Sequence, residues 1–245
     1  MNMMRKEIIS FQEDLKKFDI YLEQKQIDQF LEFYELLIKW NSFMNLTSIT
    51  EFSEVIKKHY VDSISLVKAI PGLTEKQYSL IDVGTGAGFP GIPLKIVFPE
   101  LKITLLDSLN KRVQFLNEVI CLLNLNQIDA IHGRAEDFAK QGRLRESYDI
   151  CVSRAVANLS VLAEYCIPFV KKNGYFVAYK SEKILEEYES AKKALDILGG
   201  GSVNQIEFEL PNSDINRILL VVKKNRLTPL KYPRKSGTPS KEPIS

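Results

Sequence analysis

Apolar side chains in the first part of the chain recur at intervals of three and four positions, the period of an amphipathic helix. The pattern predicts one helix over about 8–18, a second over about 23–41 and a third that begins near Ser53. The proline and glycine at 71–72 end the third helix, because neither residue favours helix continuation. We therefore expect residues 1–72 to form an N-terminal helical cap.

From position 79 onward, short apolar runs alternate with segments of helical period. The predicted strands are Ser79–Val83, Lys102–Asp107, Gln127–His132, Asp149–Ser153 and Tyr175–Lys180. The predicted helices are Pro90–Phe98, Asn110–Leu123, Leu159–Val170 and Lys183–Leu198. Alternation of this kind, with strands that are apolar throughout, indicates a parallel sheet covered by helices on both faces.

The alternation stops after three glycines at 199–201. Two further strands are predicted at Val203–Leu210 and Arg217–Lys223, separated only by Pro211–Asn216. That connection is too short for a crossover helix, so the two strands should pair antiparallel. An α/β sheet that is mostly parallel and closes with an antiparallel hairpin is typical of Rossmann-like class I methyltransferases, whereas nicotinamide-binding domains normally lack the hairpin. We assign this domain to residues 73–224.

The tail, residues 225–245, differs from the rest of the chain. It has five basic residues, a single acidic residue and four of the ten prolines, and it has too few apolar residues to make a core of its own. One interpretation is a disordered, solubilising end. We favour an arm that contacts phosphate, because Tyr232 lies among Lys231, Arg234 and Lys235.

Composition narrows the class of protein without naming a partner. The net charge is only +2, from 33 basic and 31 acidic residues. The three cysteines are isolated and form no C-x-x-C pair, so they predict neither a metal site nor a redox pair. No apolar stretch reaches membrane-spanning length, and the first ten residues lack the apolar core of a signal peptide. We expect a cytoplasmic monomer without a metal and without a membrane partner.

The stretch after the first strand carries the strongest chemical signal. Asp82, Gly84, Gly86 and Gly88 form the acid-x-Gly-x-Gly-x-Gly turn typical of S-adenosylmethionine sites. The glycines from Gly86 to Gly91 also fit the G-x-G-x-x-G pattern of dinucleotide sites. The first interpretation uses Asp82, whose carboxylate can accept hydrogen bonds from an ammonium group but would repel a pyrophosphate. We therefore favour S-adenosylmethionine.

Ligands of open α/β sheets bind beyond the carboxyl ends of the strands, where further polar residues occur in this chain. Asp107 follows the second strand and suits the ribose hydroxyls of either ligand. Ala135 and Glu136 follow the third strand, in the place where methyltransferases contact adenine, although Glu136 would also suit a helix N-terminus. Arg154 follows the fourth strand, and neither an Asp/Asn-Pro-Pro-aromatic run nor a Pro-Cys or Thr-Cys pair is present. The acceptor atom should therefore need neither an oriented amine nor covalent attack.

Several motifs together resemble one family, the bacterial guanine-N7 methyltransferases of small-subunit ribosomal RNA (RsmG, also called glucose-inhibited division protein B). The resemblance covers nearly the whole chain. It rests on Trp40-Asn41, Asn45-Leu46-Thr47-Ser48, His59 with Asp62-Ser63, Asp82 to Leu94, Leu106 to Arg112, Ser153-Arg154-Ala155, Lys180 and Tyr232 to Pro239.

The resemblance implies an activity and a set of site residues. The activity is methyl transfer from S-adenosylmethionine to N7 of one guanine in the decoding region of 16S RNA, in the small subunit or its precursor. The cofactor pocket would be lined by Gly84, Phe89, Ala135, Glu136 and Arg154, with Asp107 and Ser108 near the ribose. Residues expected to contact RNA phosphate are Lys111, Arg112, Lys180, Arg234 and Lys235. Guanine N7 already has a free lone pair, so we assign no catalytic base and regard Arg154 and Lys180 as candidate positioning residues.

Two other functions stay open from the sequence. The dinucleotide pattern would suit an NAD-dependent oxidoreductase, although no convincing catalytic lysine, tyrosine or histidine accompanies it. A ribosome-binding factor without activity would have no use for an intact glycine turn. The sequence does not decide between naked RNA, an assembly intermediate and the mature subunit as substrate.

Overall fold

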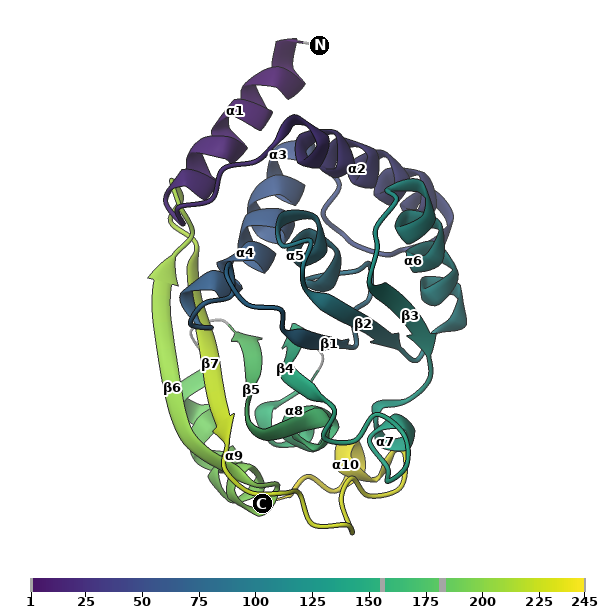
Figure 1. Ribbon diagram of the computed structural model, residues 1–245, viewed down its shortest axis with the longest axis vertical. Coiled ribbons are helices and arrows are strands. Elements are labelled where there is room, and N and C mark those ends of the chain that lie inside the picture. Colours follow the sequence, from purple (N-terminus) through teal and green to yellow (C-terminus); the bar gives the residue numbers. More distant parts are fainter. Residues whose placement is uncertain (1, 155–156, 181–183, 245) are drawn as a thin grey trace.

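The computed structural model describes residues 2–154, 157–180 and 184–244. Its centre is a seven-stranded sheet in the order β3-β2-β1-β4-β5-β7-β6 (Figure 1). The first five strands are parallel, and β7 pairs antiparallel with both β5 and β6. The predicted fold class, a parallel sheet closed by an antiparallel hairpin, is confirmed.

The strands follow the apolar runs of the sequence. Their bounds are Ser79–Val83 for β1, Lys102–Asp107 for β2, Ile128–His132 for β3, Tyr148–Arg154 for β4, Val170–Lys180 for β5, Gly200–Glu209 for β6 and Asn216–Lys224 for β7. β5 begins five residues before the predicted start at Tyr175, and its first residue, Val170, is the last residue of a predicted helix. Pro168 explains the difference, since a proline inside a helix removes a hydrogen bond and clashes with the preceding turn. The helix α8 accordingly ends at Cys166.

Helices cover both faces of the sheet. Those of the core domain are α5 (Gly91–Val97), α6 (Asn110–Leu122), α7 (Ala135–Phe138), α8 (Leu159–Cys166), the 3-10 turn η3 (Ile167–Phe169), α9 (Ile184–Ile197) and α10 (Thr238–Lys241). The predicted start of the α9 helix at Lys183 lies outside the described residues. In Figure 1, α5 and α6 lie on the same side of the sheet as the N-terminal helices, and α8 and α9 lie on the other.

The N-terminal cap is a chain of helices broken by changes of helix type. It comprises α1 (Asn2–Lys16), α2 (Gln24–Met44), α3 (Phe52–Val55), the π-helix η1 (Ile56–Val61), α4 (Asp62–Ile64) and the 3-10 helix η2 (Ser65–Lys68). One apolar cluster runs without a break from cap residues such as Phe30 and Tyr60 to sheet residues such as Val152 and Val177. The cap therefore shares its core with one face of the sheet. π-Helical turns are rare and often occur at functional sites, and η1 carries His59.

A second buried cluster lies under the opposite face, between the sheet and α8 and α9. It ends in an unexpected place, because Ile244 near the end of the chain belongs to it. We call residues 225–244 the C-terminal strap, since this segment crosses below α7 and α8 in Figure 1. The strap packs against the core domain through the buried Ile244 and through hydrogen bonds to Glu136 and Glu164, which is the geometry of an ordered segment.

Candidate cofactor and acceptor site

The glycine turn joins β1 to α5 at the carboxyl end of the sheet. Gly84, Gly86 and Gly88 have φ values of +71°, +62° and +88°, a region that residues with a side chain rarely adopt. A Cβ atom at Gly88 would lie 2.6 Å from Ile92 Cγ1, so this glycine is required for packing of the helix. A Cβ atom at Gly86 would meet nothing within 4 Å. Gly86 therefore borders open space, as a backbone that receives a ligand should.

Asp82 braces this turn from beneath. Its side chain is fully buried, and its Oδ2 accepts hydrogen bonds from Thr85 Oγ1 at 2.7 Å and from the Gly91 N–H at 2.9 Å. Oδ1 is buried and has no hydrogen-bond partner among the residues that the structure describes. Burial raises the pKa of Asp82 to about 6. A buried acceptor without a donor points to a bound group or water that supplies one, which fits a ligand with an ammonium group.

Asp107 lies next to the turn, at the end of β2. Its Oδ2 accepts from the Gly86 N–H at 2.9 Å, and its Oδ1 accepts from the Leu109 N–H at 2.9 Å. Ser108 is exposed beside it. Arg112 reaches back to Asp107 Oδ2 at 3.5 Å, whereas Lys111 is exposed. The structure thus places Asp107, predicted to contact ribose, against the glycine turn. Of the two predicted phosphate contacts on α6, Arg112 turns inward toward Asp107.

Ala135 and Glu136 lie at the start of α7 and are both buried. Glu136 Oε1 accepts a hydrogen bond from the Gly237 N–H of the strap at 2.8 Å. The predicted adenine side of the pocket is thus built from two segments, of which the sequence indicated only one.

The strap is held by a second, stronger contact. Arg234 contacts Glu164 of α8 with its backbone N–H, its Nε and its Nη2, at 2.7 to 3.1 Å, and the Glu164 side chain is fully buried. Arg145 donates to the Tyr232 carbonyl at 2.7 Å. Arg234 is therefore part of a structural ion pair, and the expectation that it belongs to a free phosphate-binding arm does not fit this geometry. Lys235 is exposed.

Arg154, at the end of β4, is the centre of a charged cluster that also includes three cap residues. Its guanidinium donates to Asp62 Oδ2 at 3.0 Å and to the Lys58 carbonyl at 3.0 Å. It also lies 3.0 Å from His59 Nδ1 and over the Phe89 ring at 5.1 Å. Phe89 stacks on His59 with ring centroids 4.4 Å apart. The aromatic residue of the glycine turn, the cap and the fourth strand therefore meet at Arg154.

His59 is neutral in this cluster. Nδ1 lies 3.0 Å from the Arg154 guanidinium and 3.1 Å from the Lys58 carbonyl, and Nε2 lies 3.0 Å from Thr47 Oγ1, so both ring nitrogens are engaged. Burial, with Arg154 as the second cause, lowers the pKa of His59 to about 3. His59 is therefore a fixed support for Arg154 and has no free nitrogen to act as a base.

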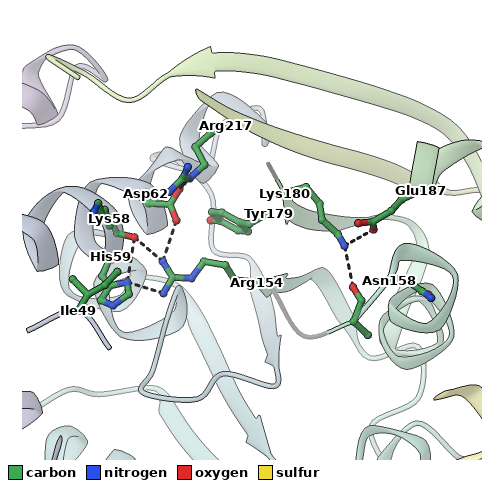
Figure 2. A pocket seen from close by; sticks show the side chains of 11 residues that line it. Ile49, Lys58, His59, Asp62, Arg154, Asn158, Tyr179, Lys180, Glu187 and Arg217 are labelled. Carbon is green, nitrogen blue, oxygen red and sulfur yellow. Dashed lines mark hydrogen bonds and ion pairs between the residues drawn. The ribbon is translucent and has the colours of Figure 1, made fainter. Parts of the chain in front are cut away.

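Next to this cluster lies a cavity of about 650 Å³. Figure 2 shows its two walls, with Asp62, His59 and Arg154 on one side and Lys180, Glu187 and Asn158 on the other. Lys180 donates to Glu187 Oε2 at 2.6 Å and to the Ala157 carbonyl at 2.9 Å, so it faces the cavity instead of the outer surface. The cavity adjoins the glycine turn through Arg154 and Phe89. It is large enough for a small ligand.

Four residues of this region were not identified from the sequence as site residues. His59 and Asp62 belong to a motif that carries the family resemblance, and their spacing of three positions puts two side chains on one helix face, so both signals were available. Arg217 donates to Asp62 Oδ1 at 2.7 Å, and no pattern indicated it. It reaches the site because β7 runs antiparallel, which puts the start of β7 beside the end of β5. Glu187 came from a segment that was predicted only as helix.

Metal and membrane features are both absent from the part of the chain that the structure describes. No three His, Cys, Asp or Glu side chains among the described residues are grouped so that they could hold a metal ion. No helix within the described ranges is both long and apolar enough to span a membrane. Cys151 and Cys166 are buried, whereas Cys121 is exposed.

The lowered pKa of His59 leads us to expect that the stability of the protein depends on pH. Because the folded pKa of His59 is about 3 and its ordinary value is 6.5, the unfolded chain gains a proton below pH 6.5 while the folded protein does not. This contribution to stability is complete above pH 6.5 and is lost as the pH falls toward 3. Relative to a His59→Gln variant, the wild type should lose about 2 kcal/mol of unfolding free energy between pH 6.5 and 5. Urea unfolding of both proteins at each pH measures the difference.

The effect of Asp82 on the pH dependence of stability has the opposite sign, so wild type must be compared with the His59→Gln variant at each pH. Its folded pKa of about 6 exceeds its ordinary value of 3.8, so protonation stabilises the folded state as the pH falls from 6 to 3.8. The wild type alone would show the sum of both effects. If the unfolding free energies of wild type and His59→Gln change in parallel with pH, His59 is not a buried neutral histidine with a lowered pKa.

Comparison with known proteins agrees with this geometry. Residues 26–215 match the family model described as rRNA small subunit methyltransferase G. Proteins called ribosomal RNA small subunit methyltransferase G are 52% identical in Lachnoclostridium phytofermentans and 55% identical in Acetivibrio thermocellus. These alignments cover 96% of both chains in the first case and 93% of both in the second.

Solved structures show the same fold at low identity. A methyltransferase from Pyrococcus furiosus has a TM-score of 0.53 and 15% identity, covering 78% of this chain and 95% of that one. M. jannaschii TYW2 in complex with AdoMet has a TM-score of 0.50 and 18% identity, covering 68% and 77%. The fold is thus that of the class I S-adenosylmethionine-dependent methyltransferases, and a nicotinamide-dependent oxidoreductase is not favoured. The chain belongs to the rRNA small subunit methyltransferase G family.

Proposed function

We propose that the protein transfers a methyl group from S-adenosylmethionine to N7 of a guanine in 16S ribosomal RNA. The observation that carries this proposal is the identity of about half of all residues to proteins named for that RNA subunit, over nearly the full length of both chains. The site is compatible with it. Gly86 borders open space, Asp82 has an acceptor without a donor, and Asp107 lies where a ribose would be held.

The choice of N7 as acceptor agrees with the chemistry of the cavity. Attack from N7 releases no proton, so a base is unnecessary. Of the groups lining the cavity, Asp62 is held by two arginines, Glu187 by Lys180, and both nitrogens of His59 are engaged. S-adenosylmethionine supplies an electrophilic methyl group. The protein then contributes placement and exclusion of water, which bring the acceptor nitrogen in line with that methyl.

We propose that the cap and the core domain act as one unit in this reaction. Arg154 belongs to the core, whereas the groups that hold it, Asp62, His59 and the Lys58 carbonyl, belong to the cap. A cofactor contact made by Arg154 would therefore depend on the position of the cap. The proposed boundary near residue 72 separates two segments of sequence within a single folded unit.

Contact with RNA phosphate is proposed mainly for Lys111 and Lys235, which are exposed. The other three predicted contacts are engaged in ion pairs, Arg112 with Asp107, Lys180 with Glu187 and Arg234 with Glu164. Lys111→Ala should weaken RNA binding similarly for all sequences and should reduce the salt slope of log K by about 1. Filter binding at several salt concentrations measures this slope.

Lys172 provides a matched control for that experiment. It is an exposed lysine near the start of β5, at the opposite end of the sheet from the site. Lys172→Ala should leave the slope unchanged. Equal effects of the two substitutions would show that only net charge matters and would remove Lys111 from the interface.

The function is tested by methyl transfer from tritiated S-adenosylmethionine to small subunits, and to their naked RNA, from a strain that lacks this protein. Label in a single N7-methylguanine of 16S RNA is the expected result. If no label enters the RNA while cofactor binding is intact, the assignments of the fold and of the cofactor pocket stand, but guanine N7 of 16S RNA is not the methyl acceptor. The comparison of subunits with naked RNA identifies the form of the substrate.

A further inference from the structure

Among the described residues that line the cavity beside Arg154, one carboxylate oxygen accepts no hydrogen bond. Glu187 Oε2 accepts from Lys180 Nζ at 2.6 Å and from the Leu159 N–H at 3.1 Å. Glu187 Oε1 has no hydrogen bond among the described residues, and the side chain is 32% exposed toward the cavity that it lines. Asp62, the other carboxylate lining the cavity, uses both oxygens for Arg154 and Arg217. Glu187 therefore has a free acceptor within a preformed, positively charged cavity.

Lys180 adds a free donor next to this free acceptor. An ammonium group has three N–H donors, and among the described residues two of them have an acceptor, the Glu187 carboxylate and the Ala157 carbonyl. The ammonium group of Lys180 and the carboxylate of Glu187 lie side by side, because the two side chains are hydrogen-bonded to each other (Figure 2). The wall thus presents a donor and an acceptor as immediate neighbours.

We propose that Glu187 and Lys180 recognise the acceptor guanine by its Watson–Crick edge, with Glu187 accepting from N1–H and Lys180 donating to O6. This assignment rests on the proposed function. Guanine has O6 and N1–H as neighbours, an acceptor followed by a donor, which complements the pair. Adenine presents a donor and an acceptor in the reverse order, so both contacts would be repulsive. Sites built to hydrogen-bond a substrate group reject analogues that leave their buried polar groups unpaired.

The same contact favours the reaction itself. In the step, the N7 lone pair forms a bond to the methyl carbon, and the carbon–sulfur bond breaks with its electron pair remaining on sulfur. The ring then carries the positive charge, no proton leaves, and N1–H becomes a stronger donor. Its hydrogen bond to the Glu187 carboxylate strengthens as the charge develops, so the contact stabilises the transition state more than the bound substrate. N1–H lies on the edge of the base away from N7. O6 lies between N1 and N7, and Lys180 would reach it from the N1 side, where Glu187 holds its ammonium group, which leaves N7 free to face the methyl group.

Glu187 also has a structural role, because it accepts a hydrogen bond from the first N–H of α8 and holds Lys180. The test must therefore separate this role from recognition of the base. Glu187→Gln keeps the shape and an acceptor for those bonds but removes the charge. We expect kcat/KM for methyl transfer to fall about ten- to hundredfold, the value of a hydrogen bond to a charged group, with unchanged affinity for S-adenosylmethionine in calorimetry. Glu189→Gln is the matched control, an exposed glutamate of the same helix paired with Lys192, and it should be neutral.

The decisive readout is base chemistry, which a structural role would not change. Small subunits are reconstituted with 16S RNA that carries inosine or N1-methylguanine at the mapped target. The wild type should methylate inosine, which keeps N1–H and O6, and should fail on N1-methylguanine. For Glu187→Gln, the loss of activity on N1-methylguanine relative to guanine should be smaller than for the wild type. The effects of the protein change and the base change are then not additive, which shows that the two groups interact.

The outcomes separate this inference from the function on which it rests. Wild-type protein that labels no guanine N7 refutes the proposed function. Wild-type protein that labels guanine but methylates N1-methylguanine equally well overturns the role of Glu187, and this result stands even if Glu187→Gln does not fold. Equal activity of Glu187→Gln and wild type also overturns it.

Discussion

Replacing Gly86 by valine should weaken S-adenosylmethionine binding about a hundredfold in a protein that still folds. Gly86 has φ of +62°, and a Cβ atom there would meet nothing within 4 Å, so the new side chain would project into the space assigned to the cofactor. Overfilling a site by a side chain of this size costs about 3 kcal/mol, which is about a hundredfold in affinity. Isothermal calorimetry measures the loss, and circular dichroism confirms the fold.

Gly142 provides a control that separates steric exclusion from backbone strain. It has φ of +80°, a Cβ atom there would likewise meet nothing within 4 Å, and it is exposed in the loop after α7. Gly142→Val should carry a similar strain, of order 1–2 kcal/mol for a non-glycine residue in this region, and bind the cofactor normally. Wild-type affinity in Gly86→Val, or equal losses in both variants, would contradict the pocket assignment.

Replacing Arg234 by alanine should lower the free energy of unfolding by about 3 kcal/mol. Glu164 is fully buried, and Arg234 supplies its charge partner together with several hydrogen bonds. Without the arginine, the carboxylate is left as an unpaired buried charge. We give the lower end of the usual range because the Arg234 side chain is 26% exposed, so water can replace part of the contact. Urea unfolding at pH 7 measures the change.

Lys235→Ala, one position further along the strap, is the matched control. Lys235 is exposed, so its loss should change stability by less than about 0.5 kcal/mol. The two variants also decide between the structural strap and a phosphate-binding arm. If Arg234→Ala has the unfolding free energy of the wild type and a reduced salt slope in RNA binding, the segment is a phosphate-binding arm and not a structural strap.

Local patterns were sufficient for most of the fold. β1 and β2 have the predicted bounds, because each is an apolar run whose neighbours in the sheet are strands of the same kind. The antiparallel closing hairpin followed from the length of one connection. Pro168 was the local signal that the α8 helix stops early, and the prediction of a helix through Val170 did not use it. The insertion of β7 between β5 and β6 had no local signal.

The cofactor side of the site was similarly accessible from the sequence, since Asp82, Gly86 and Asp107 each follow a strand of the parallel sheet. The acceptor side of the site could not be predicted in this way. His59 and Asp62 reach Arg154 from more than ninety positions away, and Arg217 arrives through the antiparallel strand. The order of the strap could not be predicted, because composition describes only what a segment can bury by itself. Its stability comes from Glu136, Glu164 and Arg145, which lie elsewhere in the chain.

The strap also has a consequence for the kinetics of folding. Its contacts join residues far apart in the chain, 70 positions for Arg234 with Glu164 and 101 positions for Gly237 with Glu136. Closing such long loops costs entropy before the contacts can form, so we expect them after the rate-limiting step of folding. Contacts made that late affect the rate of unfolding and hardly affect the rate of folding. The strap should therefore set the lifetime of the folded enzyme, and Arg234→Ala should unfold faster while refolding at the wild-type rate in stopped-flow measurements.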